Sequence, residues 1–185
     1  MDCMLPLEAV WLVLPAYLAN ASAVVLGGGT PIDFGKTWRD KRLLGDGKTW
    51  RGAGSGILVG MAAGMLMNHL APDTYGTGAG SLLIIFALAY GTLSGDMLES
   101  FVKRRLGKES GAHWPIADQV DFLIGAFTCS FLMSFFLDKL GINDGNWFLS
   151  RFTVWHVLFL LAFTPLLHYA TNVAGYLAGL KKVPW

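Results

Sequence analysis

Long apolar runs are the feature of this sequence that most constrains its fold. There are five of them, each of about twenty residues, the length that a helix needs to cross the hydrocarbon core of a bilayer. Charged residues make up only 15% of the 185 residues, against about 25% in a soluble domain. We therefore expect an all-α integral membrane protein, a single transmembrane domain over residues 1–185 built as a bundle of five helices. The predicted spans cover residues 7–27, 53–72, 79–95, 119–139 and 153–178.

Cationic side chains are distributed unevenly between the two sides that this topology defines. Twelve of the 14 Lys and Arg residues lie between spans one and two, between spans three and four, or after span five. Only Lys139 and Arg151 fall on the other side. Loops rich in Lys and Arg stay in the cytoplasm. The pattern predicts a multi-pass protein of the cell membrane, with its N-terminus outside and its C-terminus and two functional loops in the cytoplasm.

Glycine residues recur at short intervals in the second span, as in Gly60-x-x-x-Gly64. Small residues at this spacing allow helices to approach closely in lipid. Packing inside the bundle and a homodimer contact both explain such a stripe, and the sequence leaves the choice open.

The loop between spans three and four carries acids as well as cations. Asp96, Glu99, Ser100 and Lys103 follow the spacing i, i+3, i+4 and i+7, which places them on one face if span three continues as a helix. Two further acids three residues apart, Asp118 and Asp121, lie at the start of span four. Two helices would then present carboxylates to one point.

These residue types suit a site for a metal ion and a nucleotide. Mg²⁺ prefers carboxylate oxygens and bridges to phosphates, so Asp96, Asp118 and Asp121 are candidate metal ligands. Lys and Arg residues neutralise polyphosphates, a role open to Lys103, Arg104 and Lys108. A salt-bridged loop that only sets topology would explain the cations but not the acids, which are costly beside a membrane.

The loop between spans one and two contains Gly47-Lys48-Thr49 directly before Trp50. A P-loop would require glycine at position 42, where Arg42 stands, and a preceding strand. We therefore reject that motif. A Gly-Lys-Thr turn before a helix can still bind phosphate through backbone N–H groups and Lys48.

At these residues the chain resembles the phosphatidate cytidylyltransferase (CDP-diacylglycerol synthase) superfamily. Ser100-x-x-Lys103-Arg104 fits its Ser-x-x-Lys-Arg pattern, and His113, Asp118 and Asp121 have the spacing of its His-Gly-Gly-x-x-Asp-Arg-x-Asp element.

The sequence departs from the superfamily pattern in three places. Trp114-Pro115 stands in place of Gly-Gly, and Gln119 in place of Arg. The acid after Lys108 is Glu109 instead of Asp, and it comes one position earlier than in the superfamily pattern. The five-span length and the segment 42–52 are more similar to the archaeal branch, the CDP-archaeol synthases. The resemblance covers roughly residues 31–125.

The resemblance implies transfer of a cytidylyl group from CTP to an isoprenoid ether-lipid phosphate, 2,3-bis-O-geranylgeranylglycerol 1-phosphate, with Mg²⁺ as cofactor. The products would be unsaturated CDP-archaeol and pyrophosphate. Membrane lipids are the other expected partners, and no nucleic-acid partner is expected. The implied catalytic residues are Asp96, Lys103, Asp118 and Asp121. The implied substrate-binding residues are Asp33, Lys36, Arg39, Arg42, Lys48, Thr49, Arg51, Ser100, Arg104, Lys108 and His113.

Two other functions remain as alternatives. A CTP-dependent polyprenol or lipid kinase would transfer the γ-phosphate and produce CDP, but the Ser-x-x-Lys-Arg and His-Asp-Asp patterns favour cytidylyl transfer. A non-enzymatic membrane transporter would be expected to carry charged residues in both halves of the bundle, whereas here they crowd one side.

Overall fold

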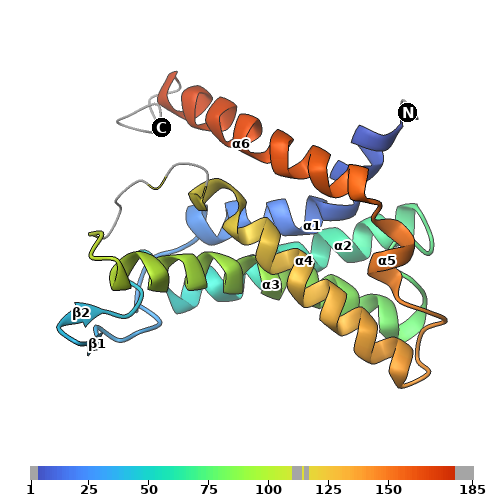
Figure 1. Ribbon diagram of the computed structural model, residues 1–185, viewed down its shortest axis with the longest axis horizontal. Helices are drawn as coiled ribbons and strands as arrows, with labels where there is room; N and C mark the ends of the chain where they lie inside the picture. The colour runs from blue at the N-terminus through green and yellow to red at the C-terminus, as the bar shows by residue number, and fades with distance from the viewer. Residues whose placement is uncertain (1–3, 110–113, 115–116, 178–185) are drawn as a thin grey trace.

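The described part of the chain contains five long helices, which run between two ends of the molecule (Figure 1). The structure is a computed structural model and describes residues 4–109, 114 and 117–177. All five helices are long and apolar enough to cross a membrane, which confirms the predicted class of a five-helix membrane protein. The helices are α1 (Leu5–Val25), α2 (Trp50–Leu70), α3 (Gly78–Arg105), α4 (Ala117–Lys139) and α6 (Val154–Leu177).

A two-stranded hairpin and a short helix lie in the connections between these helices. At one end, which we call the charged end, residues 26–49 join α1 to α2, and β1 (Thr37–Trp38) pairs antiparallel with β2 (Lys41–Arg42). At the opposite end, α5 (Trp147–Arg151) precedes α6. The sequence did not predict the hairpin or α5, because two strands of two residues and a helix of five are too short to show a periodic pattern.

The third helix extends well beyond the apolar run that predicted it. We expected a span over 79–95, whereas α3 contains 28 residues and ends at Arg105. At 1.5 Å per residue it is about 42 Å long, longer than the roughly 30 Å of a hydrocarbon core. The change from apolar to polar residues after position 95 therefore marks the end of the hydrophobic segment and not the end of the helix. The last ten residues of α3 form one wall of the charged end.

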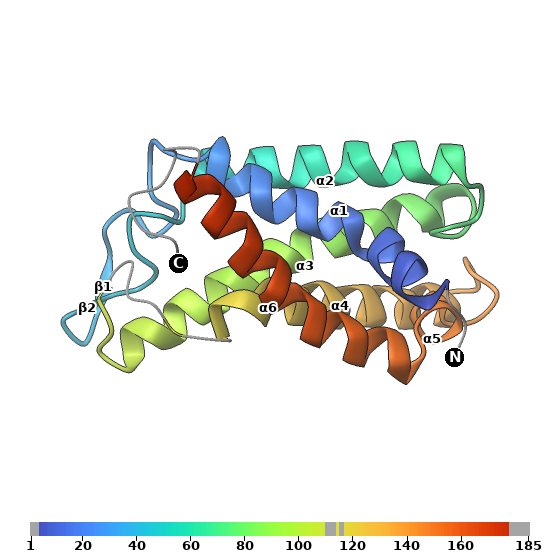
Figure 2. The same cartoon turned by 90° about the horizontal axis from the view of Figure 1, so that it is seen from above.

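The most extensive helix contact is between α3 and α4 (Figure 2). Their backbones meet where Gly91 and Gly95 of α3 face Gly125 of α4. A Cβ atom added to Gly125 would collide with the carbonyl oxygen of Gly91 and the backbone of Gly95. Glycine at these positions lets the two helices approach as closely as small-residue motifs allow in membranes.

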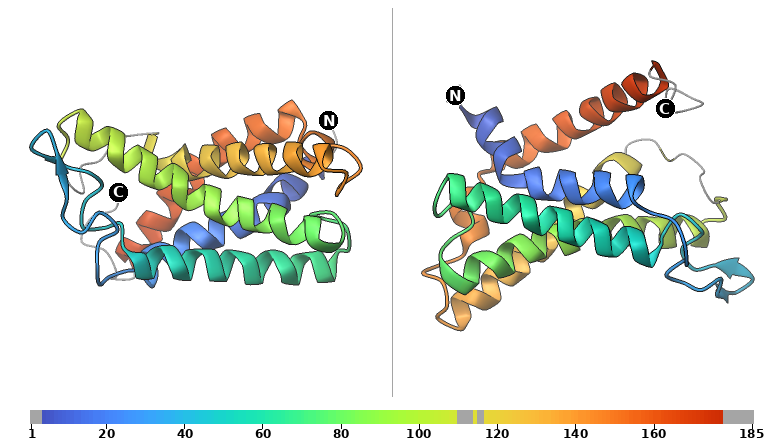
Figure 3. Two further views of the ribbon diagram at one scale, coloured as in Figure 1. Left: turned by 90° about the horizontal axis from the view of Figure 1, so that it is seen from below. Right: turned by 180° about the vertical axis from the view of Figure 1, so that it is seen from behind.

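The glycine stripe of α2 is also used inside the bundle. Gly60 packs against Ala19 of α1 and Ala89 of α3, and Gly64 packs against Ile85 of α3. Figure 3 shows α2 next to α1 and next to the first part of α3. The stripe thus serves helix packing within the chain, and the homodimer stays a prediction with no surface assigned to it.

The last helix, α6, leaves the bundle as it approaches the charged end (Figure 1). The Tyr17 hydroxyl of α1 lies 2.6 Å from the Thr164 hydroxyl, and the ring of Phe122 stacks on His168 with centroids 5.8 Å apart. Beyond these contacts Tyr169 and Leu177 are exposed. The charged end is therefore built mainly by α1 to α4 and their loops.

We predict that Gly125→Ala destabilises the protein, while Gly54→Ala does not. The new methyl at position 125 would meet rigid backbone atoms of α3, whereas nothing lies within 4 Å of a Cβ at position 54. Overpacking of this kind costs about 1–3 kcal/mol. Thermal unfolding in detergent should show a lower midpoint for Gly125→Ala and an unchanged or slightly higher one for Gly54→Ala. Equal midpoints would show that the helix crossing is looser than described.

Candidate active site

A pocket of about 260 Å³ lies at the charged end, between α3, the start of α4 and the loop before α2. We call it the polar pocket. Four of its lining side chains are acidic and three are cationic. Its lining residues are Leu44, Gly47, Lys48, Asp96, Glu99, Ser100, Lys103, Arg104, Asp118 and Asp121.

The polar continuation of α3 supplies one wall of this pocket. Asp96, Glu99, Ser100 and Lys103 all line it, in agreement with the shared helical face expected from their spacing. Ser100 is buried, and the side chain of Lys103 is only 10% exposed. The wall therefore places charged groups in a partly desolvated environment, where electrostatic interactions are stronger than in water.

Ion pairs connect lysines from two elements to the carboxylates. The Lys48 ammonium, from the loop before α2, lies 2.6 and 2.7 Å from the two oxygens of Asp96. The Lys103 ammonium lies 3.0 Å from Glu99 Oε1 and 2.6 Å from Asp118 Oδ1. Pairing of this kind compensates charges that would be costly to bury alone.

The two aspartates of α4 occupy different positions in the pocket. Asp118 Oδ2 accepts a hydrogen bond from the Trp114 backbone N–H at 3.0 Å. Asp121 Oδ1 accepts one from the N–H of Phe122 at 2.6 Å, and its carboxylate interacts electrostatically with Asp96, Glu99 and Lys48. Asp121 thus faces Asp96 across the helix crossing, while Asp118 lies beside Glu99 and shares Lys103 with it.

The residues fit a divalent cation by donor chemistry, although they do not form a finished metal site. Within residues 4–109, 114 and 117–177, no three His, Cys, Asp or Glu side chains are arranged to hold a metal ion. Lysine ammonium groups already contact Asp96 and Asp118. All three candidate aspartates line one pocket with the oxygen donors that Mg²⁺ prefers, so a cation requires the lysines to move first.

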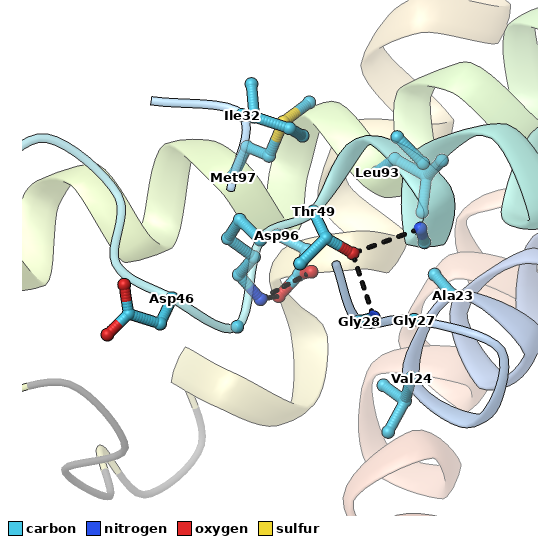
Figure 4. A pocket seen from close by; sticks show the side chains of 14 residues that line it. Ala23, Val24, Gly27, Gly28, Ile32, Asp46, Thr49, Leu93, Asp96 and Met97 are labelled. Carbon is cyan, nitrogen blue, oxygen red and sulfur yellow. Dashed lines mark hydrogen bonds and ion pairs between the residues drawn. The ribbon is translucent and has the colours of Figure 1, made fainter. Parts of the chain in front are cut away.

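Two largely apolar cavities reach the polar pocket from different sides. The first, of about 450 Å³, lies between α1, α2 and α3 and includes Ala23, Leu93 and Met97 (Figure 4). Lys48 and Asp96 line both this cavity and the polar pocket.

The second apolar cavity, of about 390 Å³, is a groove between α3 and α4, which we call the α3–α4 groove. Leu98, Val102 and Ile124 line it, and it meets the polar pocket at Glu99 and Asp121. Charged groups and membrane-facing apolar surface therefore adjoin at the same site.

A buried aspartate organises the loop before α2. The side chain of Asp33 is 1% exposed and forms a two-point ion pair with Arg42, with contacts of 2.8 and 3.2 Å. It also accepts hydrogen bonds from the backbone N–H groups of Gly35, Leu44 and Gly45. Burial alone would raise the pKa of Asp33, but Arg42 and these three donors outweigh it and hold the pKa well below its usual range. Asp33 therefore fixes the shape of the loop.

The sequence analysis did not predict a structural role for Arg105. Its guanidinium lies over the rings of Trp38 and Phe101, at 5.1 and 5.2 Å from their centroids. It also donates hydrogen bonds to the carbonyl oxygens of Trp38, Lys41 and Arg42. Arg105 thus joins the hairpin to the end of α3. Within the neighbouring sequence, only Phe101 one turn earlier could have indicated this role. The hairpin residues that Arg105 contacts lie more than sixty residues away.

Three more of the predicted residues lie near the polar pocket and make structural contacts there. Thr49 caps α2 by accepting from the Gly52 N–H and also accepts from Gly28 N–H, each at 3.1 Å (Figure 4). Arg51 donates to the Leu26 carbonyl. Lys108 lies over the Trp114 ring.

Two further predicted residues are not brought into the polar pocket. Lys36 and Arg39 are exposed and line none of the three cavities described above. His113 lies outside the described residues.

Comparison with known proteins agrees with this architecture. A family model described as CarS-like, CDP-archaeol synthase, matches residues 1–185. The CDP-archaeol synthase of Pyrococcus horikoshii is 47% identical over 180 residues, which cover 97% of this chain and 96% of that one. The CDP-archaeol synthase of Methanococcoides burtonii is 45% identical over 185 residues, 94% of this chain and 100% of the relative.

A solved structure, described as an intramembrane enzyme for archaeal membrane lipid biosynthesis, superimposes with a TM-score of 0.73. It is 39% identical and covers 90% of this chain and 94% of its own. The helical bundle with its charged pocket is therefore that of an integral membrane enzyme. More particularly, the chain belongs to the CDP-archaeol synthase family.

We predict that Asp33→Asn loosens the loop over residues 36–48. The amide keeps the size of the side chain but loses the ion pair with Arg42. Hydrogen–deuterium exchange of the Leu44 and Gly45 amides should therefore become about tenfold faster, as expected for losing about 1.4 kcal/mol of charge-assisted hydrogen bonding. The matched control is Asp40→Asn, an exposed aspartate of the same loop with a positive φ that asparagine accepts. Equal exchange in the two variants would contradict the anchoring role of Asp33.

The same contact predicts a pH dependence of the loop in the unsubstituted protein. The pKa of Asp33 is lower in the folded state than in the unfolded chain. The ionised carboxylate therefore stabilises the fold fully at neutral pH. This stabilisation is lost as the pH falls below the ordinary pKa of an aspartate and approaches the lower pKa of the folded state. Exchange at Leu44 and Gly45, corrected for the chemical rate, should rise only below about pH 4. A rise that starts near pH 6 would point to a different group.

Proposed function

We propose that this protein transfers a cytidylyl group from CTP to 2,3-bis-O-geranylgeranylglycerol 1-phosphate and releases pyrophosphate. The observation that carries this proposal is the polar pocket, where carboxylates and cations adjoin two apolar cavities at one end of a membrane bundle. A water-soluble polyanion and a lipid phosphate can meet at such a place. The names of its relatives support the same reaction.

The reaction needs two polyanions to approach each other. An oxygen of the lipid phosphate attacks the α-phosphorus of CTP, a new P–O bond forms, and the bond to the bridging oxygen of the β-phosphate breaks. The attacking phosphate is already anionic at neutral pH, so positioning and charge stabilisation account for most of the catalysis. Lys48, Lys103 and Arg104 are the pocket cations that would hold the phosphates.

Asp96, Asp118 and Asp121 are the residues that would hold Mg²⁺. The ion would supply positive charge to the phosphate oxygens during transfer. Release of Lys48 from Asp96 and of Lys103 from Asp118 would make both groups available, the carboxylates to the cation and the lysines to phosphate. Ser100 and His113 would add hydrogen bonds to substrate, and Asp33 with Arg42 would keep the loop in shape on the nucleotide side.

We place the charged end in the cytoplasm, where CTP is available. The excess of Lys and Arg in the loops at that end supports this orientation, which puts the N-terminus outside. The lipid would then reach the polar pocket from the adjoining leaflet, with its chains lying in the membrane.

The α3–α4 groove is the route that we propose for the lipid. Its lining is almost entirely apolar, and its inner end is formed by Glu99 and Asp121. An isoprenoid chain in the groove would bring its phosphate to the acids of the polar pocket, where a bound cation would offset the repulsion.

A product assay tests the proposed function. Purified protein with α-³²P-CTP, Mg²⁺ and the unsaturated ether-lipid phosphate should move label into the lipid fraction and release pyrophosphate, and EDTA should stop both. Asp118→Asn should reduce the rate about 10²-fold or more, because it removes a charged group from the site of charge development. Asp144→Asn, an exposed aspartate at the opposite end, should retain the full rate. Label that remains in water-soluble CDP would identify a lipid kinase instead.

The lipid route predicts a selective effect of filling the groove. Thr128→Trp should raise the KM for the lipid phosphate about tenfold, as expected for losing about 1.4 kcal/mol of binding, with the KM for CTP unchanged. Leu132→Trp one turn further along α4 is the control, because Leu132 is exposed outside the groove. An unchanged lipid KM in Thr128→Trp would move the route to the cavity between α1, α2 and α3.

A further inference from the structure

A cavity with polar walls lies at the end of the molecule opposite to the active site. It has a volume of about 560 Å³ and lies between the start of α1, α5 and the start of α6. Figure 2 shows the start of α1 beside α5 and the start of α6. We call this cavity the distal pocket. Its lining includes Glu8, Arg151, Thr153, Trp155 and His156.

Two opposite charges line the distal pocket without pairing with each other. The Arg151 guanidinium donates to the carbonyl oxygen of Asp73 at 2.5 Å. The ion pairs among the described residues include none between Arg151 and Glu8. The Glu8 carboxylate is about half exposed, and its one close charged or titratable neighbour in the described part of the chain is His156, at 3.6 Å. Both charges therefore remain available to a ligand.

His156 lies against Glu8 but does not neutralise it. The backbone N–H of Thr153 donates to Nδ1 of His156 at 3.1 Å, which places the ring proton on Nε2. The Nε2 atom is buried and has no hydrogen-bond partner among the described residues. Its separation of 3.6 Å from Glu8 Oε2 is too long for a hydrogen bond. An imidazole in this form carries no charge, so the negative charge of Glu8 is left for a ligand.

The rim of the distal pocket faces the membrane. Val154 and Trp155 at the start of α6, and Leu7 of α1, are exposed apolar side chains, and tryptophan is enriched where a span meets the head groups. Glu8 lies in the first turn of one span, and Arg151 directly precedes another. Unpaired charges at this level are costly. Lipid head groups of the adjoining leaflet are the polar groups that such a rim would meet.

We propose that the distal pocket binds the head group of a zwitterionic membrane lipid, with its ammonium at Glu8 and its phosphate at Arg151. An anionic head group would leave Glu8 opposed to it, and a simple cation would leave Arg151 without a partner. A primary ammonium and a phosphate diester satisfy both residues, and an ammonium has the three N–H donors that a carboxylate accepts. This site is separate from the proposed cytidylyl transfer.

The expected consequence of binding is a more stable bundle. Glu8 belongs to α1, whereas Arg151 belongs to the short helix directly before α6. A head group that contacts both would connect α1 to α6, the helix that leaves the bundle toward the charged end (Figure 1). A ligand that binds only the folded state raises its stability.

Thermal unfolding in a non-ionic detergent tests the proposal. Dihexanoyl phosphatidylethanolamine at saturating concentration should raise the unfolding midpoint by about 5 °C. Dihexanoyl phosphatidylglycerol has the same chains and phosphate but no ammonium, so it should give a much smaller shift. Equal shifts from the two lipids would overturn the proposal.

Substitutions separate the two charges of the pocket. Glu8→Gln should reduce the shift from phosphatidylethanolamine to that from phosphatidylglycerol, and Arg151→Gln should reduce both shifts. Asp144→Asn removes an exposed acid at the same end that does not line the pocket and should keep the difference between the lipids. Each shift is measured from the lipid-free midpoint of the same variant, so a less stable variant still reports on binding. An undiminished preference in Glu8→Gln would contradict the assignment.

The source of the zwitterion is tested by removing the chains. Glycerophosphoethanolamine carries the same head group without acyl chains and should give no shift at the same concentration. A shift equal to that from the lipid would show that the pocket takes a soluble zwitterion, and would overturn the assignment to a membrane lipid.

Discussion

The close crossing of α3 and α4 is the constraint on which the site depends. Gly91, Gly95 and Gly125 bring the two backbones into contact, and no larger residue fits between them. Asp96 directly follows Gly95, and Asp121 lies one turn before Gly125, so the crossing sets both carboxylates at one level. The acids therefore face each other because helix backbones touch, and their separation does not depend on the conformation of a loop.

That enforced approach creates an electrostatic problem, which the lysines solve. Four carboxylates at the end of a membrane bundle would repel one another, and burial makes unpaired charges still more costly. Lys48 pairs with Asp96, and Lys103 with Glu99 and Asp118, so two cations offset part of the charge of this cluster. The same lysines are the groups that a polyphosphate would attract. Any polyphosphate that draws them away exposes carboxylates to a cation, so nucleotide and cation would each favour the binding of the other.

Much of this arrangement could be predicted from the sequence, and the rest depends on contacts between distant segments. The length of the apolar runs predicted five spans, and the spacing of Asp96, Glu99, Ser100 and Lys103 predicted a shared face. The pairing of Lys48 with Asp96 spans 48 residues, and no local pattern specifies it. The hairpin was missed because its strands have two residues each, too few for an alternating pattern. The metal ligands remain predictions, since lysines contact two of the three.

Arg42 shows how these distant contacts combine the two loops into one surface. Its side chain reaches inward to Asp33, while its carbonyl oxygen accepts a hydrogen bond from Arg105 at the end of α3. These polar contacts fix the loop before α2 together with the stacking of Trp38 on Phe101. Arg105 in turn follows Arg104, which lines the polar pocket. The conformation of the first loop and the position of the Arg104 guanidinium are therefore coupled through two adjacent residues, and a change in that loop reaches the polar pocket.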